Sequence, residues 1–475
     1  MNKKVPVGFF PSSIGLIFTV AAVFCSSPSA AGMSSPWTSY FSAQDLAVPW
    51  AKTIRGIGRK KTGASLMDAS GRITANGWSV FTRVENKLVE VLKSRDVIVQ
   101  IGGLRSARNQ EKFSSFMELI KSDRAASWKE TVYKQAVRVA KINGAENGFY
   151  WQIGNEINSR HYSRSLRGWA GLQGNAHPDD AAIIKYYVEY FLAPTVEALE
   201  SASLGVYGSR DKIQILLGTI ANAKRESSRQ WLDELLDYEI RGDYAESLAG
   251  KRVYELVDIV GIHYLVTLKD VGWVEALDEI HGKWIGKGRV RGIWATEELG
   301  KKRGKDGRGA STAIRVAARY IHWWNKSGVT PEESRCNFWG WTFGKSGGSG
   351  FDGIQTLYDF FGDTPLVEIE TGLTSDVSGG LESYLFKSAS DPSKRAVIAF
   401  PRGKNSRLRL QNMTMKSAGW SADVNATVHF FSVSGHDILP VSVEKTDDAY
   451  RFTLAGAALL KKQAVIMMFL RQKRG

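Results

Sequence analysis

The chain has 475 residues, of which 43% are hydrophobic and 23% are charged. This length predicts two or three domains, or one large barrel with an appendage. The composition excludes a disordered, collagenous or coiled-coil protein. Lys and Arg number 63 against 48 Asp and Glu, a formal net charge of +15. Such a charge can attract anionic polysaccharide, a membrane surface or nucleic acid, or it can serve solubility alone.

Residues 1–31 have the pattern of a signal peptide. Two lysines and an apolar run, 14–24, precede small residues of a cleavage site at 29–31. The apolar run is shorter than the roughly 17–25 residues that a membrane-spanning helix needs. We therefore expect a periplasmic or secreted protein without membrane insertion. Once Cys25 is removed with this segment, Cys336 remains alone, so no internal disulfide can form.

Strand patterns alternate with helical patterns up to about residue 360. The predicted strands are 97–103, 149–155, 213–220, 257–263, 291–297 and 337–343, and the predicted helices are 128–142, 181–199, 230–238, 273–284 and 312–324. Two more strands are expected in 33–80, with 34–41 and 64–67 as candidates. This alternation predicts an α/β fold with a parallel sheet, and eight strands would close it into a (β/α)8 TIM barrel over 32–362.

From residue 363 to 475 the pattern changes to short alternating runs separated by Gly, Asp, Asn and Ser. Such runs are typical of antiparallel strands. We expect a C-terminal β-sandwich domain that packs on the barrel.

Two strand patterns end in a carboxylate. The run 151–158 brings Asn155 and Glu156 to the point where a strand meets its loop, and the run 293–300 does the same for Glu297. In an eight-strand count these are the fourth and seventh strands, and a barrel closes such ends around one mouth. Retaining glycoside hydrolysis needs one carboxylic acid to protonate the leaving oxygen and one carboxylate to attack the anomeric carbon. The pattern predicts this chemistry, with no metal and no cofactor.

These strand ends resemble the retaining glycoside hydrolases of the clan A (β/α)8 superfamily. Asn155-Glu156 is similar to the fourth-strand motif of the clan, and Thr296-Glu297 is similar to its seventh-strand motif. The resemblance implies that Glu156 is the acid/base and that Glu297 is the nucleophile. Asn155, beside the acid, is expected to donate to a sugar hydroxyl.

Two further strand ends extend the resemblance, which covers about 97–345. His263-Tyr264 resembles the sixth-strand ending, whose aromatic or His side chain holds the nucleophile. Trp341 resembles the eighth-strand Trp that forms the floor of the sugar site. A barrel followed by a β-sandwich is similar to the β-xylosidase and exopolysaccharide-hydrolase group. The resemblance thus implies substrate-binding roles for His263, Tyr264 and Trp341.

The seventh strand leaves two candidates for the nucleophile. The clan often places one residue between Glu and Gly, and this spacing fits Glu298 rather than Glu297. Strand alternation favours Glu297, because it would then turn Trp294 and Thr296 outward toward the helices.

Basic residues crowd the loops at the predicted catalytic end, and Arg105 is the expected substrate-binding residue among them. Arginine can bind a uronate carboxylate through two parallel hydrogen bonds. We therefore expect an acidic poly- or oligosaccharide substrate rather than nucleic acid. The other basic residues of this predicted rim are Arg108, Arg160, Arg164, Arg167, Lys224, Arg225, Arg229, Lys269, Lys301, Lys302, Arg303, Lys305, Arg308 and Lys345.

Two alternatives compete with the glycosidase. Gly344–Gly348 matches the G-x-S-x-G elbow of serine hydrolases, with Ser346 as nucleophile and His429 or His436 later in the chain. An elbow leads into a helix, whereas the glycine-rich continuation predicts none. The second alternative is a non-catalytic carbohydrate-binding protein, which would keep the aromatic residues but has no need of two facing carboxylates.

Overall fold

The structure is a computed structural model. It describes residues 37–40, 53–55, 96–101, 110–141, 149–159, 166–171, 181–263, 265–266, 272–298, 308–330, 333–338, 349–362, 364–369, 374–376, 381–402, 408–416, 420, 423–432, 435–460 and 464–473. All of these residues belong to one compact unit of the chain, Met33–Gly475. The predicted signal peptide, 1–31, and the candidate strand 64–67 lie outside the described residues.

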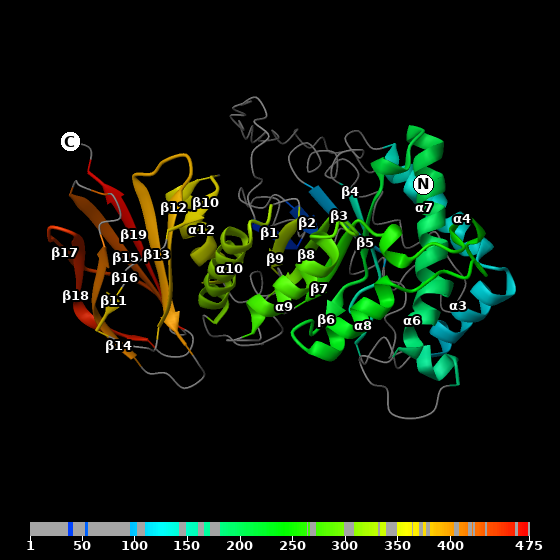
Figure 1. Ribbon diagram of the computed structural model, residues 1–475, viewed down its shortest axis with the longest axis horizontal. Coiled ribbons are helices and arrows are strands. Elements are labelled where there is room, and N and C mark those ends of the chain that lie inside the picture. The colour runs from blue at the N-terminus through cyan, green and yellow to red at the C-terminus, as the bar shows by residue number, and fades with distance from the viewer. Residues whose placement is uncertain are drawn as a thin grey trace, which may run out of the picture. The chain divides into compact units, whose positions relative to one another are not determined.

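Nine of the described strands form one parallel sheet (Figure 1). They are β1 (Trp37–Tyr40), β2 (Thr53–Arg55), β3 (Asp96–Ile101), β4 (Phe149–Ile153), β5 (Gln214–Leu217), β6 (Ile220–Ala221), β7 (Ile259–His263), β8 (Gly292–Glu298) and β9 (Ser334–Phe338). The predicted strands 97–103, 149–155, 257–263 and 291–297 are confirmed by β3, β4, β7 and β8. The candidate 34–41 is confirmed by β1, and the second strand lies at β2.

The strand order is β5-β4-β3-β2-β1-β9-β8-β7-β6, and β5 also pairs with β7. This additional pairing joins Leu216 to Ile259. The order of hydrogen-bonded strands therefore returns to β5, the strand at which it begins. Strand β6 follows β5 along the chain after a break of two residues. Because all of these pairings are parallel, the carboxyl ends of the strands lie at one end of the sheet.

Helices separate most of these strands along the chain. They are α3 (Gln110–Ser122), α4 (Ala126–Ala140), α6 (Ala182–Tyr187), α7 (Ala193–Tyr207), α8 (Glu226–Leu236), α9 (Trp273–Ile280), α10 (Arg308–Ser327) and α12 (Ser349–Phe361). A π-helical turn, Val188–Leu192, joins α6 to α7, so the predicted helix 181–199 is confirmed in a longer form. Within the described residues, no helix is both long and apolar enough to cross a membrane.

The region after Ser346 differs from the expectation. We expected the glycine-rich stretch from 349 to 353 to be non-helical, but α12 begins at Ser349. The apolar and aromatic residues that follow, such as Ile354 and Leu357, are buried. Their packing outweighs the low helix propensity of glycine, which costs about 1 kcal/mol per residue. Ser346 itself lies outside the described residues.

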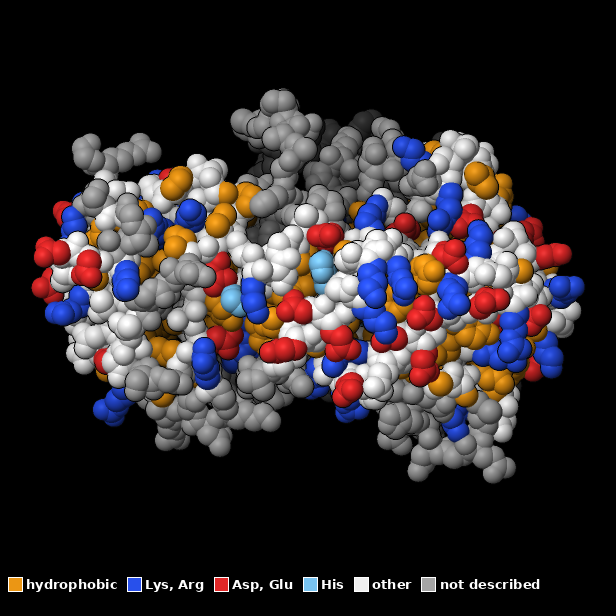
Figure 2. Space-filling model, in the orientation of Figure 1, with side chains coloured by type: hydrophobic (Ala, Val, Ile, Leu, Met, Phe, Trp, Pro, Cys, Tyr) orange, Lys and Arg blue, Asp and Glu red, His pale blue; other side chains and the backbone are white. Residues whose placement is uncertain are grey.

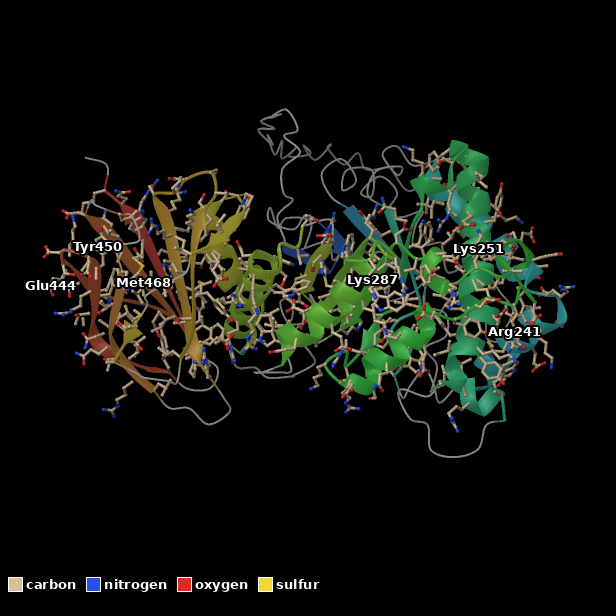
Figure 3. All side chains as sticks on the ribbon, in the orientation of Figure 1. Arg241, Lys251, Lys287, Glu444, Tyr450 and Met468 are labelled. Carbon is tan, nitrogen blue, oxygen red and sulfur yellow. The ribbon has the colours of Figure 1, made fainter. Side chains whose placement is uncertain are left out.

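The C-terminal strands form two antiparallel sheets. The first has the order β10-β12-β13-β19-β15-β16 and the second has β11-β14-β18-β17. Their bounds are β10 (Leu366–Glu368), β11 (Thr374–Ser375), β12 (Leu381–Ser388), β13 (Lys394–Pro401), β14 (Leu408–Lys416), β15 (Val424–Ser432), β16 (Gly435–Leu439), β17 (Val441–Lys445), β18 (Ala449–Leu460) and β19 (Val465–Gln472). Met468 and Tyr450, one from each sheet, belong to the same buried cluster, whereas Glu444 is exposed (Figure 3).

The largest hydrophobic core continues from the helices into the antiparallel strands. It includes Tyr320 and Ile321 of α10 together with Tyr384, Phe400 and Phe469. Helix α10 contacts β10, β13, β15 and β19 (Figure 1). The expected packing of the C-terminal strands on the α/β part is confirmed by this shared core.

Candidate active site

Glu156 lies in the loop directly after β4 and has an unusual backbone conformation. Its φ is 52°, in the left-handed region that non-glycine residues rarely adopt. Such conformations cost about 1–3 kcal/mol and persist where the surroundings impose them. The side chain is 17% exposed. A strained, partly accessible carboxylate at the carboxyl end of a buried strand is a strong candidate for function.

The segment between β5 and β6 imposes this conformation. The Glu156 backbone N–H donates to Thr219 Oγ1 at 2.9 Å, and the Ile157 N–H donates to the Thr219 carbonyl at 3.0 Å. Asn158 exchanges two hydrogen bonds with the Ala221 backbone, at 3.0 and 2.7 Å. Four hydrogen bonds therefore fix the loop that carries Glu156 to the neighbouring strand ends.

Side chains from three strand ends form a connected set that includes Glu156. Its Oε1 lies 3.3 Å from His263 Nδ1 at the end of β7. The other ring nitrogen of His263, Nε2, lies 3.1 Å from Thr296 Oγ1 on β8. An ionised Glu156 can only accept, so Nδ1 then carries the proton and Nε2 accepts from the Thr296 hydroxyl. This connected set therefore links the end of β4 to that of β8.

His263 and Thr296 are both fully buried. The resemblance implied that His263 binds substrate and holds the nucleophile, whereas its described contacts are to Glu156 and Thr296. A role through Glu156 fits this burial better than contact with a sugar. Thr296 was missed as a site residue, because alternation was taken to turn it toward the helices.

The orientation that we expected for β8 is wrong. Trp294 does not pack in the helix layer. It clusters with Ile98, Tyr150, Leu216 and Ile259 from four other strands, and its ring centroid is 4.5 Å from that of Tyr150. The neighbours of Trp294 along the strand, Ile293 and Ala295, belong instead to the core shared with the helices. We expected that a ring of this size would need the space between the sheet and the helices. The face shared by these five strands accommodates it instead.

Strand alternation also fails at the end of β8. The pairing register shifts between Ala295 and Glu298 on one side, and between Ile262 and His263 on the other, where His263 pairs with Glu297. Such an irregularity inserts a residue and changes which face the following side chains occupy. A one-residue alternation rule therefore cannot choose between Glu297 and Glu298.

The contacts of Glu298 do bear on that choice. Its carboxylate is fully buried, and Oε1 accepts from the Val266 N–H at 3.2 Å and from the Tyr320 hydroxyl at 3.0 Å. Burial, with the charge of Glu298, raises the pKa of Tyr320 well above its ordinary value, so this hydroxyl stays a donor. Glu298 is thus bound between the end of β7 and α10. The side chain of Glu297 lies outside the described part of the structure.

The remaining predicted site residues are only partly described. Asn155 is buried beside Glu156, whereas Arg105, Tyr264 and Trp341 lie outside the described residues. In the serine-hydrolase alternative, His429 and His436 contact each other, with Nδ1 and Nε2 2.9 Å apart.

Arg229 is the best-described member of the predicted basic rim. Its Nε lies 2.6 Å from Glu279 Oε2, and one terminal nitrogen donates to the carbonyls of Ala223 and Lys224 at 3.2 and 3.1 Å. These contacts engage Nε and one terminal nitrogen of the guanidinium. On the face drawn in Figure 2, Lys and Arg side chains lie among Asp and Glu side chains.

A cavity of about 660 Å³ lies at the opposite, amino end of the parallel strands. Asp258, Arg291 and Glu333, which line it, directly precede β7, β8 and β9. Arg210 and Arg289 add positive charge, but the acidic residues balance it. The cavity is therefore separate from the strand-end carboxylates and favours no charge class of ligand.

No protein-family model matches the chain, and no curated protein matches it either. Among solved structures, it is similar to a glycoside hydrolase family 44 xyloglucanase from Paenibacillus polymyxa, with 9% identity, a TM-score of 0.49 and coverage of 93% of this chain and 97% of that chain. A family 44 endoglucanase from Clostridium acetobutylium ATCC 824 has 11% identity, a TM-score of 0.47 and the same coverage. A 4-O-α-L-rhamnosyl-β-D-glucuronidase from Fusarium oxysporum 12S has 11% identity, a TM-score of 0.47 and coverage of 94% and 98%. With TM-scores of 0.49 or less, these similarities by themselves assign neither fold nor activity.

Proposed function

We propose that the protein is a retaining glycoside hydrolase, with Glu156 as acid/base and Glu297 as nucleophile. The observation that carries the proposal is the contact from Glu156 through His263 to Thr296. This contact brings together the ends of β4 and β8, the two strands whose carboxylates the mechanism needs. We also infer that the closed circuit of parallel strands is a (β/α)8 barrel and that the antiparallel sheets form a β-sandwich.

In this mechanism a protonated Glu156 donates to the glycosidic oxygen while Glu297 attacks the anomeric carbon. The resulting covalent glycosyl-enzyme is then hydrolysed by a water that Glu156 deprotonates, and the configuration is retained. The two carboxyl groups of such enzymes are about 5–5.5 Å apart. Glu297 is preferred over Glu298, because the buried Glu298 carboxylate is already held by Val266 and Tyr320.

The proposal includes export by the 1–31 segment and an acidic, uronate-containing polysaccharide as substrate. Export would bring the enzyme to extracellular glycans, and the excess of Lys and Arg over Asp and Glu, which remains after Lys3 and Lys4 are removed, would attract acidic ones. The finer likeness to the β-xylosidase and exopolysaccharide-hydrolase group belongs to the same proposal.

The mechanism is tested with variants of the strand-end carboxylates. Glu156→Gln and Glu297→Gln should each lower kcat by about 1000-fold or more, because an amide neither donates the proton nor attacks. Azide should restore turnover to Glu297→Gly and yield a glycosyl azide of inverted configuration, which proton NMR identifies. Proton NMR of the first product of the wild-type enzyme should show the retained anomer.

Glu298→Gln is the matched control. An amide oxygen can still accept from Val266 and Tyr320, so this variant should keep most of its activity. An inactive Glu298→Gln beside an active Glu297→Gln would transfer the nucleophile to Glu298. An inverted first product would overturn the retaining mechanism.

A further inference from the structure

Helix α10 connects the candidate active site to the antiparallel domain through two adjacent side chains. Tyr320 donates its hydroxyl to Glu298 Oε1 at 3.0 Å, at the end of β8. Arg319 binds Glu382 of β12 in a bidentate manner, with Nε to Oε1 at 2.8 Å and a terminal nitrogen to Oε2 at 2.7 Å. One turn of helix thus contacts both the strand that carries the candidate nucleophile and the C-terminal domain.

Val266 joins these two contacts into one network. Its N–H donates to Glu298 Oε1 at 3.2 Å, and its carbonyl accepts from the second terminal nitrogen of Arg319 at 3.4 Å. Val266 is fully buried and follows His263 by three residues. The end of β7, which contributes His263 to the site, is therefore held between Glu298 on one side and Arg319 on the other.

The ion pair between Arg319 and Glu382, at the centre of this network, is almost completely buried. Arg319 is 3% exposed and Glu382 is 8% exposed. The Tyr384 hydroxyl adds a third bond to Glu382 Oε1 at 2.6 Å. Burial and the charge of Glu382 raise the pKa of Tyr384, so this hydroxyl remains a donor. A buried charge is costly without its partner, so Glu382 fixes the position of the Arg319 guanidinium.

We propose that Glu382, in the antiparallel domain, is a positioning residue for the candidate active site. It orients Arg319, which holds the Val266 carbonyl and so keeps the ends of β7 and β8 in the geometry that places His263 against Glu156. This inference rests on the proposed function for its effect on turnover. The antiparallel domain is then part of the catalytic apparatus rather than an attached binding module.

A second contact between α10 and the same antiparallel sheet provides a control. His322, one turn further along α10, contacts Glu368 of β10, with Nδ1 and Oε2 2.7 Å apart. Glu368→Gln weakens the packing of α10 on this sheet. The hydrogen bonds of Val266 described above involve neither His322 nor Glu368, although the ring of His322 packs against that of Tyr384. A merely structural role for Glu382 predicts equal consequences at the two sites.

The experiment compares Glu382→Gln, Glu382→Asp and Arg319→Lys with Glu368→Gln. Aspartate keeps the charge but is too short to keep both bonds, and lysine keeps the charge but lacks the planar fork. We expect kcat on a cleaved glycan to fall about tenfold in the first three variants, with KM within about twofold, because small displacements of positioned groups cost rate. Glu368→Gln should keep wild-type kcat at a similar loss of Tm.

Hydrogen exchange gives a readout that does not need activity. The peptide containing Val266 should exchange about tenfold faster in the Glu382 and Arg319 variants, because the Val266 N–H is held within this network. In Glu368→Gln its exchange should be unchanged. Equal exchange and equal kcat across all four variants, or losses that follow Tm alone, would overturn the positioning role. If the wild-type protein cleaves no glycan, the proposed function fails, and exchange at Val266 still decides whether the network holds β7.

Discussion

At the residue scale, the carboxylate of Glu156 is positioned by a strained backbone conformation, which lowers the stability of the fold. Glu156 adopts a φ of 52°, and hydrogen bonds from its own N–H and that of Ile157 to Thr219 hold it there. His263 then fixes the side chain from β7, with Thr296 behind it. The orientation of Glu156 therefore depends on the Thr296 hydroxyl, which is two contacts away from it.

Replacing Thr296 tests this dependence. Thr296→Val keeps the shape but leaves the buried Nε2 of His263 without its hydroxyl donor, and such losses cost about 1–3 kcal/mol. We expect kcat to fall about tenfold with KM within about twofold, because His263 then holds the Glu156 carboxylate less firmly. Thr296→Ser, which keeps the hydroxyl, should restore kcat. The contact of Thr296 with His263 has no role in turnover if the valine and serine variants have the same kcat.

At the scale of elements, the backbones after β5 and at the end of β4 approach each other closely. A Cβ at Gly218 would lie 2.3 Å from the Ile153 carbonyl oxygen and 2.7 Å from Ile157 Cγ2. No side chain fits there unless the strand ends move apart. Gly218 directly precedes Thr219. The close backbone approach at Gly218, which excludes a side chain there, therefore also brings the Thr219 hydroxyl within hydrogen-bonding distance of the Glu156 N–H.

Gly218→Ala should therefore damage stability and activity together. Overpacking of this kind costs about 1–3 kcal/mol, and the displaced Thr219 would release Glu156, so kcat should fall more than the loss of folded protein explains. Gly282→Ala is the control, because a Cβ at Gly282 meets nothing within 4 Å. Thermal unfolding and kcat measured on both variants give the comparison. A Gly218→Ala enzyme with wild-type Tm and kcat would show that the strand ends can separate freely.

At the scale of the whole molecule, the positive charge is not confined to one end. Arg241, Lys251 and Lys287, which Figure 3 labels, are exposed on segments that follow a helix and precede a strand, away from the carboxyl ends of the strands. Net charge alone therefore cannot direct an acidic polymer to the site. The proposed preference for a uronate substrate therefore requires that basic residues in the loops after the strands attract the substrate.

Two triple variants separate the effect of charge near the candidate site from the effect of the net charge of the protein. Reversing Lys301, Lys302 and Arg303 to Glu should raise KM on an acidic glycan several-fold and flatten its salt dependence, because screening shortens from about 10 Å at 0.1 M salt to about 3 Å at 1 M. Reversing Arg241, Lys251 and Lys287 to Glu changes the net charge equally and should leave KM near that of wild type. Equal KM values for the two triple variants, or a neutral xylan cleaved as well as any polyuronate, would refute the acidic-substrate proposal.

The sequence by itself determined the parallel strands and the position of Glu156 at a strand end. Buried parallel strands are continuous apolar runs, such as 149–153 and 259–263, and this signal is local. The helices α4, α8 and α10 were predictable for the same reason, since an apolar stripe repeats within one element.

Only the tertiary structure decided the rest. The inward face of Trp294, the helix that begins at Ser349 and the burial of Glu298 against Tyr320 depend on neighbours far away in the chain. The irregular pairing at the end of β8 shifts the side-chain faces, and no alternation pattern within the strand reveals it. Thr219 and Arg319 carry no sequence signal at all, because each acts through a backbone group that only the folded chain brings within hydrogen-bonding distance.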